Sequence, residues 1–118
     1  MKEVIHVWLD QVEKEIIVPQ RIIALNFGLY DTEKGYCMYL VGTSKYDEND
    51  DEWAEDVKKL PREFFLEIKT KCNWKEFQEQ VTRILTDEIK HRTANTSSPF
   101  CNKVITTGFD DGSLTRIV

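Results

Sequence analysis

The hydrophobic and polar positions of residues 2–42 change period once, and this change predicts a helix followed by a β-hairpin. Within 2–17, apolar residues recur every three or four positions, which is typical of an amphipathic helix that ends before Pro19. The period then becomes two, so a strand is expected, and the turn D-T-E-K-G leads into a second strand, Y-C-M-Y-L-V-G. Gly35 is available for a positive φ in that turn. Because the second strand is apolar on both faces, we expect it in the middle of a sheet.

The second half of the chain predicts a strand, a helix and a terminal hairpin. The apolar segment after Pro61 predicts a strand over 62–69. Asn73, followed by Glu76 three residues later, is typical of a capped helix start, and the helix is expected over 73–91. Residues 103–118 read as a hairpin whose Asp-Gly pair suits a type I′ turn. The expected buried stripe of the helix comprises Trp74, Phe77, Val81, Ile84, Leu85 and Ile89.

These elements predict one α+β domain over 1–118. The expected order is helix 2–17, hairpin 21–42, an acidic loop 46–60, strand 62–69, helix 73–91 and hairpin 103–118. A chain of 118 residues with 41% hydrophobic and 31% charged residues has the size and balance of a single folded unit. The fold class is therefore a mainly antiparallel sheet of about five strands with two amphipathic helices packed on one face.

Charge is concentrated in one stretch, Y-D-E-N-D-D-E-W-A-E-D, which spans residues 46–56 and contains no Lys or Arg. Its seven carboxylates contribute −7 to a net charge of −5, so the rest of the chain carries +2. Such local acidity attracts a basic partner and disfavours binding to nucleic acid or to anionic membranes. The candidate partner-binding residues are Tyr46, Asp47, Glu48, Asp50, Asp51, Glu52, Trp53, Glu55 and Asp56.

Trp53 has two plausible placements within this acidic loop. Large aromatic side chains are mostly buried, so our first expectation is that Trp53 pins the loop to the core while the carboxylates point outward. In the alternative, Trp53 stays partly exposed among the charges as an interface hot spot. The loop itself is either a solvated connection that keeps the sheet edge soluble or a partner-binding surface. The sequence leaves both choices open.

The sequence offers no convincing set of catalytic residues. His6 and His91 are the only histidines, and neither shares a local motif with a cysteine. Cys37 lies within the expected central strand, where a small buried side chain is a simpler interpretation than a nucleophile. Asp110 and Asp111 resemble a carboxylate pair, but an Asp-Gly turn already explains them. We therefore predict no enzymatic activity, and keep a small enzyme using Cys37 or this aspartate pair only as a minor alternative.

Metal and cofactor sites are also not predicted. Asp47, Asn49 and Asp51 have the alternating oxygen-ligand spacing of a calcium loop. The pattern then fails, because its sixth position is Glu52, where a glycine is needed, and its twelfth is Lys58, where a glutamate belongs. The glycines form neither a dinucleotide-binding motif nor a P-loop.

Cysteine usage and hydropathy predict a cytoplasmic protein. The three cysteines are odd in number and include no C-x-x-C pair, which argues against a disulfide framework. The N-terminal segment lacks the apolar run of a signal peptide, and no window approaches the roughly 18 apolar residues of a membrane span.

Three short motifs resemble a known group of proteins. They are N-F-G in the first strand, Y-D-x-x-D-D-x-W in the acidic loop and G-F-D-D-G in the last hairpin, within 24–54 and 106–118. These runs look like small bacterial immunity proteins of polymorphic toxin systems, including contact-dependent growth inhibition. The resemblance implies a non-enzymatic inhibitor that binds a cognate toxin domain in the cytosol and covers its active site or substrate groove. Many such toxins are nucleases with basic grooves, which an acidic patch could occupy.

The charge pattern and the resemblance lead to one hypothesis, an immunity protein that neutralises a basic toxin domain by stoichiometric binding through its acidic surface. Nanomolar binding requires about 12 kcal/mol, so an anchor such as Trp53, Tyr46 or Tyr30 must add to the charges. The alternative is a regulatory or scaffold module that binds a basic host protein without blocking an activity. The oligomeric state is left open.

Overall fold

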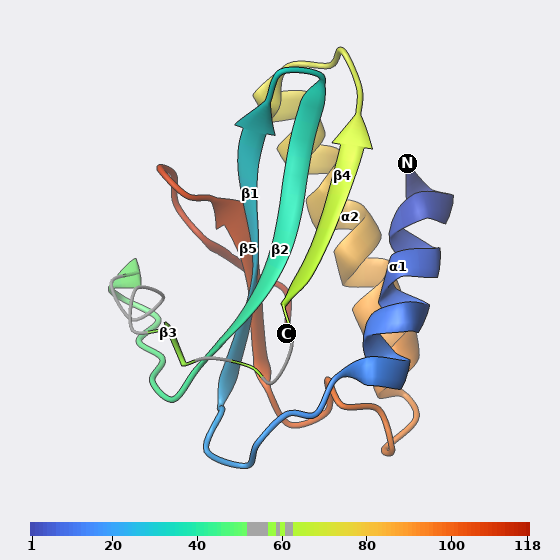
Figure 1. Ribbon diagram of the computed structural model, residues 1–118. Coiled ribbons are helices and arrows are strands. Elements are labelled where there is room, and N and C mark those ends of the chain that lie inside the picture. The colour runs from blue at the N-terminus through green and yellow to red at the C-terminus, as the bar shows by residue number, and fades with distance from the viewer. Residues whose placement is uncertain (52–56, 59, 61–62) are drawn as a thin grey trace.

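The chain folds as an α+β domain in which a curved sheet carries two helices (Figure 1). The computed structural model describes residues 1–51, 57–58, 60 and 63–118. Within these residues the elements are α1 (Lys2–Glu15), β1 (Ala24–Thr32), β2 (Gly35–Thr43), β3 (Val57–Lys58), β4 (Phe64–Lys69), α2 (Trp74–Thr93), β5 (Val104–Phe109) and β6 (Thr115–Arg116).

The β1–β2 hairpin forms the centre of the sheet, as the sequence predicts. Its register pairs Thr32 with Gly35 and Ala24 with Thr43. The outer edge of β2 pairs antiparallel with β4 and, further along, with β3. The other edge of β1 pairs in parallel with β5, and β5 pairs antiparallel with β6. The mainly antiparallel sheet is confirmed, and the parallel β1–β5 pair lies beyond what the sequence predicts.

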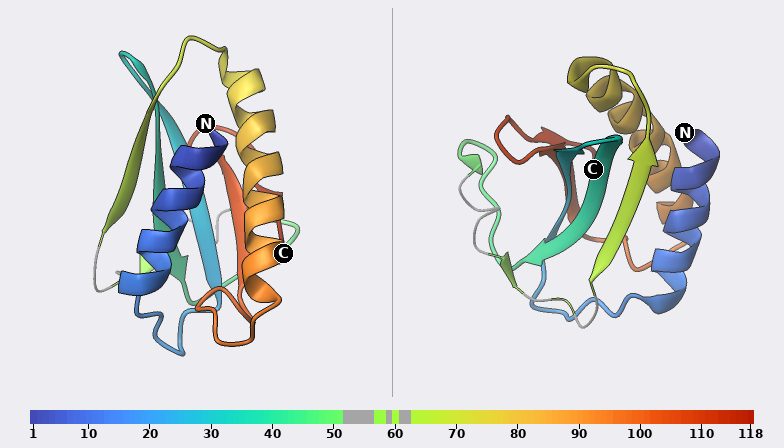
Figure 2. Two further views of the ribbon diagram at one scale, coloured as in Figure 1. Left: turned by 90° about the vertical axis from the view of Figure 1, so that its right-hand side faces the viewer. Right: turned by 45° about the horizontal axis from the view of Figure 1, so that its top comes forward.

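Both helices pack on the same face of the sheet, again as predicted (Figure 2). The apolar stripe of α1 is buried along its length, and in α2 the residues at helical spacing from Phe77 to Ile89 are fully buried, except Ile84, which is partly buried. Asn73 caps α2 by accepting a hydrogen bond from the backbone N–H of Glu76. Facing the helices, alternate strand residues complete the core: Leu25, Phe27, Leu29, Met38, Leu40, Phe64, Ile68, Ile105 and Phe109.

One predicted core position of α2 is wrong. Trp74 has 58% of its surface exposed, although it fits the helical stripe. Phe77, one turn later, already stacks on Tyr36 with a ring separation of 4.1 Å. Trp74 therefore extends past this stack. Its ring and that of Phe109 pack in a T-shaped arrangement, with their centres 6.2 Å apart and an interplanar angle of 89°.

The predictions of a positive φ at Gly35 and of a type I′ turn in the last hairpin are both wrong. No glycine within the described part of the chain has a positive φ. Gly35 is instead required by close packing, because a Cβ there would lie 2.0 Å from the carbonyl oxygen of Ile68. The last hairpin has a longer connection, Asp110 to Leu114, rather than a two-residue type I′ turn. The predicted loop 46–60 also contains the short strand β3.

A cluster of ion pairs joins α1 to α2 around Arg92, whose side chain is only 8% exposed. Its guanidinium lies 2.9 Å from Asp10 Oδ1 and 2.9 Å from Glu88 Oε1, and it also pairs with Glu13. His6 Nδ1 lies 2.8 Å from Glu88 Oε1. Burial disfavours the charged guanidinium, but the hydrogen bonds to Glu13, Glu88 and Asp10 raise the pKa of Arg92 above its usual value. We call these residues the Arg92 cluster.

Candidate functional site: an acidic segment beside an open aromatic face

The first described stretch of the acidic loop, Tyr46 to Asp51, forms a tight turn after β2. The carboxylate of Asp47 accepts a hydrogen bond from the backbone N–H of Asn49 at 2.9 Å, and its carbonyl accepts one from Asp50 N at 3.3 Å. This side-chain and backbone pairing is the local reason why the chain turns here. The side chains of Asp47, Glu48, Asp50 and Asp51 are all exposed. We call residues 46–51 the acidic segment.

The acidic segment is held against the C-terminal hairpin. The Asp51 carboxylate accepts a hydrogen bond from the backbone N–H of Leu114 at 3.1 Å. The guanidinium of Arg116 lies 5.4 Å from the centre of the Tyr46 ring, in a cation–π contact. Between segment and hairpin is a hollow of about 280 Å³, which Glu48 also lines. The segment and the hairpin therefore lie against one another, and the exposed carboxylates of the segment stand beside this contact.

Several predicted site residues, Glu52, Trp53, Glu55 and Asp56, lie outside the described residues. The choice between a buried and an exposed Trp53 therefore stays a prediction. The calcium-like pattern also extends beyond the described residues, because its sixth position is Glu52. Elsewhere in the described chain, no group of three or more His, Cys, Asp or Glu side chains could hold a metal ion.

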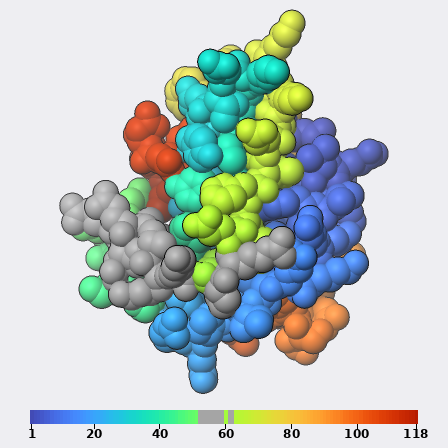
Figure 3. Space-filling model, in the orientation of Figure 1, coloured from blue at the N-terminus to red at the C-terminus, as the bar shows by residue number. Residues whose placement is uncertain are grey.

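The face of the sheet opposite the helices carries exposed aromatic side chains. Tyr30 on β1 is 39% exposed, and Phe65 on β4 is 55% exposed. Tyr39 on β2 lies between them, since its Cα pairs with that of Phe65 and its ring lies 5.9 Å from that of Tyr30. We call the surface formed by Tyr30, Tyr39 and Phe65 the aromatic face. Figure 3 shows the strands β1, β2 and β4 uncovered by any helix on this side of the molecule.

Tyr39 is fixed in place by two contacts. Its ring lies over Gly28, where an added Cβ would be 2.1 Å from Tyr39 Cζ. Its hydroxyl donates a hydrogen bond to Asp110 Oδ1 in the C-terminal hairpin. Burial and this hydrogen bond raise the pKa of Tyr39 well above its usual value, so the phenol is neutral at physiological pH. A rigid, neutral aromatic ring thus stands at the middle of the face.

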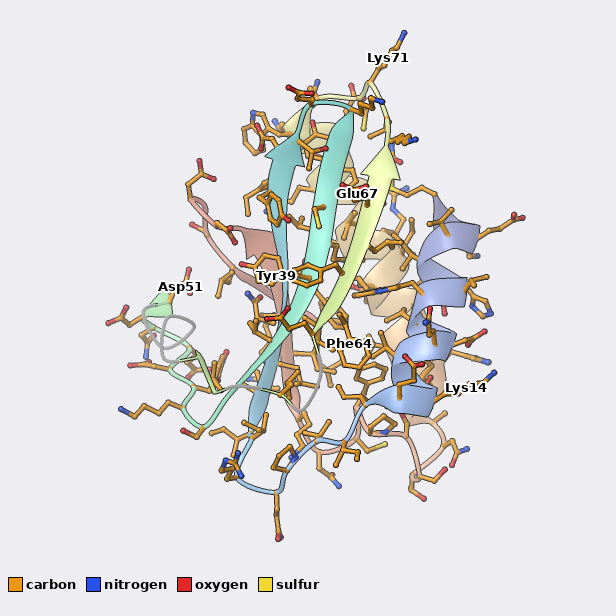
Figure 4. All side chains as sticks on the ribbon, viewed as in Figure 1. Lys14, Tyr39, Asp51, Phe64, Glu67 and Lys71 are labelled. Carbon is orange, nitrogen blue, oxygen red and sulfur yellow. The ribbon has the colours of Figure 1, made fainter. Side chains whose placement is uncertain are left out.

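Carboxylates border the aromatic face as well. Glu67 on β4 is exposed and pairs by register with Cys37, two residues along each strand from the Tyr39–Phe65 pair and therefore on the same face. Asp110 stands at the opposite border, where it accepts the bond from Tyr39. In Figure 4, Tyr39 and Glu67 lie on the strands turned toward the viewer, and Asp51 lies to the left of the strands in the acidic segment. The combination of aromatic surface and negative charge suits a basic protein partner.

The two histidines lie apart from Cys37 in the described part of the chain. Cys37 is 3% exposed, and its register with Tyr30 and Glu67 places it on the side of the sheet away from the helices. His6 belongs to the Arg92 cluster on the helical side, and His91 is exposed near the end of α2. The expectation that Cys37 is a buried strand residue is confirmed.

Comparisons with protein families, curated proteins and solved structures returned no match to this chain. Among the described residues, no helix has the length and apolar character that crossing a bilayer requires. The functional interpretation therefore depends on the geometry of the surface and on the resemblance of the sequence motifs.

Sequence reasoning names Tyr30 as an anchor but misses Tyr39 and Phe65. A signal for Phe65 exists in the strand prediction, because consecutive residues point to opposite faces and Phe64 faces the core. The place of Tyr39 depends on two long-range contacts, with Gly28 and Asp110, and no local pattern encodes them.

Proposed function

We propose that this chain is an immunity protein that neutralises a basic toxin domain by forming a stoichiometric complex. The observation that carries the proposal is the aromatic face, which is bordered by the carboxylates of Glu67 and Asp110 and is connected to the acidic segment through the C-terminal hairpin. Half-exposed aromatic side chains on a rigid sheet are the residues expected at the centre of a protein interface. The motif resemblance in the sequence supplies the specific class of partner.

The two parts of the surface have different tasks in this proposal. The exposed carboxylates of Asp47, Glu48, Asp50 and Asp51 attract a basic partner and raise the association rate. Charges at an interface rim add little affinity, so they do not supply the roughly 12 kcal/mol of a nanomolar complex. Tyr30 and Phe65 provide apolar area that the partner desolvates, and such anchors slow dissociation.

The same surface makes other partners less suitable. Phosphate backbones and anionic lipids are repelled by the acidic segment. A catalytic role is not part of the proposal, and neither is a metal or a cofactor. The proposed place of action is the cytoplasm, where a toxin domain of this class would meet its inhibitor.

The test is co-expression with the reading frame upstream of the gene, whose product is the expected toxin. We expect the unaltered protein to restore growth, and the double variant Tyr30→Ser/Phe65→Ser to lose rescue with a dissociation rate at least about 100-fold faster, equivalent to roughly 2.7 kcal/mol. A quadruple variant, Asp47→Asn/Glu48→Gln/Asp50→Asn/Asp51→Asn, should associate more slowly and with a flatter salt dependence.

A matched control separates the surface from general charge effects. Glu3→Gln/Asp87→Asn removes two exposed carboxylates from the helical side and should leave growth rescue and association unchanged. An upstream product that is harmless alone would contradict the immunity role. Full rescue by the Tyr30→Ser/Phe65→Ser variant would exclude the aromatic face as the interface. A complex that forms without blocking the partner's activity would favour the scaffold alternative.

A further inference from the structure

Trp74 stands exposed beside the C-terminal hairpin, away from the aromatic face. Its indole rests edge-on against Phe109, which is 6% exposed and packs against Tyr36 and Phe77. This support fixes the ring without covering it. Trp74 borders a hollow of about 520 Å³ between the start of α2, the end of β1 and the hairpin. We call this hollow the Trp74 groove.

Two carboxylates line the Trp74 groove together with the indole. Asp31 comes from the end of β1, and Asp111 comes from the connection between β5 and β6. Both residues are exposed, and within the described chain neither carboxylate forms an ion pair or accepts a hydrogen bond. Gln78 and Thr115 add polar side chains to the same hollow. An aromatic surface flanked by two carboxylates that are not engaged in ion pairs is the chemical arrangement that binds organic cations.

Neighbouring positive charges do not cancel this preference. An adjoining hollow, which also contacts Trp74, is lined by Lys75, Arg83 and Glu79 and carries a net positive charge. None of these three side chains lines the Trp74 groove itself. The start of α2 contributes about half a positive charge, against two full negative charges from the aspartates. The groove is therefore lined by negative charge although it adjoins a positively charged hollow.

We propose that the Trp74 groove binds the guanidinium group of an arginine side chain presented by a basic polypeptide. A guanidinium is planar, so it stacks on an indole while its N–H groups reach carboxylates at the edge of the stack. The size of the hollow admits the whole arginine side chain, and the polar Gln78 and Thr115 are placed to contact the peptide that carries it.

This site is separate from the surface of the proposed function. The acidic segment contacts Leu114 and Arg116, whereas the Trp74 groove is lined by Ser113 and Thr115. Alternate residues of the hairpin thus face the two sites from opposite sides. Variants of one site can be tested without altering the other.

The experiment is an NMR titration of the full chain with the peptide acetyl-Gly-Arg-Gly-amide. We expect saturable shifts of the Trp74 indole N–H and of the Gly112 and Ser113 amides, with the indole signal assigned by a Trp74→Phe variant. The matched control is the same peptide with citrulline, which keeps the shape of arginine but has no charge. The citrulline peptide should produce no saturable shift.

Variants test which side chains of the groove bind the arginine peptide. Trp74→Leu should weaken arginine-peptide binding about two- to fivefold, the range for a cation–π contact at an exposed site, with the Gly112 and Ser113 amides as readout. Asp31→Asn/Asp111→Asn should weaken it further, while the charge-matched Glu3→Gln/Asp87→Asn variant should bind like the unaltered protein. Equal binding of the citrulline peptide, or unchanged binding by the aspartate double variant, would overturn the proposal.

Discussion

Two groups of carboxylates in this protein have similar chemistry and opposite surroundings. In the Arg92 cluster, Asp10, Glu13 and Glu88 converge on one guanidinium whose side chain is 8% exposed. In the acidic segment, exposed carboxylates follow one another along the chain, and those of Asp47 and Asp51 accept hydrogen bonds from backbone N–H groups.

The difference shows which charges hold the fold together. Carboxylates that share a largely buried cation connect two helices, and removing the cation leaves them facing one another without compensation. Carboxylates that face solvent repel one another and contribute little to stability, and in the proposed function they act on association instead. Burial of the shared partner, rather than the number of charges, separates the two roles.

The largest expected effect is the loss of the shared cation. Arg92→Met should lower the free energy of unfolding by about 3 kcal/mol, because it leaves three carboxylates close together between α1 and α2. Urea denaturation followed by circular dichroism measures this change. Lys90→Met, at an exposed position of the same helix, is the matched control and should change stability by less than about 0.5 kcal/mol. Equal midpoints for the two variants would contradict a structural role for the cluster.

A second expected effect is a dependence of stability on acid pH. Although burial of Glu88 opposes its charged form, hydrogen bonds from Arg92 and His6 lower its pKa below the usual value. A lowered folded-state pKa stabilises the protein fully above the ordinary glutamate pKa of about 4.3, and this stabilisation is lost as the pH falls through the folded-state value. Urea midpoints between pH 6 and pH 3 should therefore fall less steeply for Glu88→Gln than for the unaltered chain. Parallel slopes would remove Glu88 as a source of the acid sensitivity.

The smallest expected effect on stability belongs to the acidic segment. The quadruple variant Asp47→Asn/Glu48→Gln/Asp50→Asn/Asp51→Asn should change the free energy of unfolding by less than about 0.5 kcal/mol. The new side-chain amides keep an oxygen that accepts the N–H bonds of Asn49 and Leu114, and the mutual repulsion disappears. Thermal unfolding monitored by circular dichroism tests this. A loss of 2 kcal/mol or more would mean that the segment has a structural role like that of the Arg92 cluster.

Local patterns predict the elements of this fold well. The helical spacing of 2–17, the capping of α2 by Asn73 and the alternation in the β1–β2 hairpin are each encoded within a few neighbouring residues. The position of Trp74 is not, because it fits the stripe of α2 and only the Phe77–Tyr36 stack shows that the core ends one turn later. The failed turn predictions have the same origin, since Gly35 is required by its neighbour Ile68 in β4 rather than by its own φ.

Of the candidate site, only the concentration of negative charge could be predicted from the sequence. The acidic segment is visible as composition, and Tyr30 is named from the sequence as a possible anchor. The aromatic face requires knowledge of which strands are neighbours, because Phe65 meets Tyr39 through the β2–β4 pair. The Arg92 cluster had a local signal in the spacing of Glu88 and Arg92, but its link to Asp10 and Glu13 depends on how the two helices pack.

The parallel pair of β1 and β5 has a consequence for how the chain is made. β1 meets this neighbour only 80 residues further along the chain, as the bond between Thr106 and Asn26 shows. On the ribosome, the β1–β2 hairpin and β4 therefore emerge while one apolar edge of β1 is still without a strand. Until residues 104–109 follow, that edge can pair with a nascent copy on the same messenger RNA. A helical bundle of equal length, whose contacts are mostly local, would expose no such strand edge during synthesis.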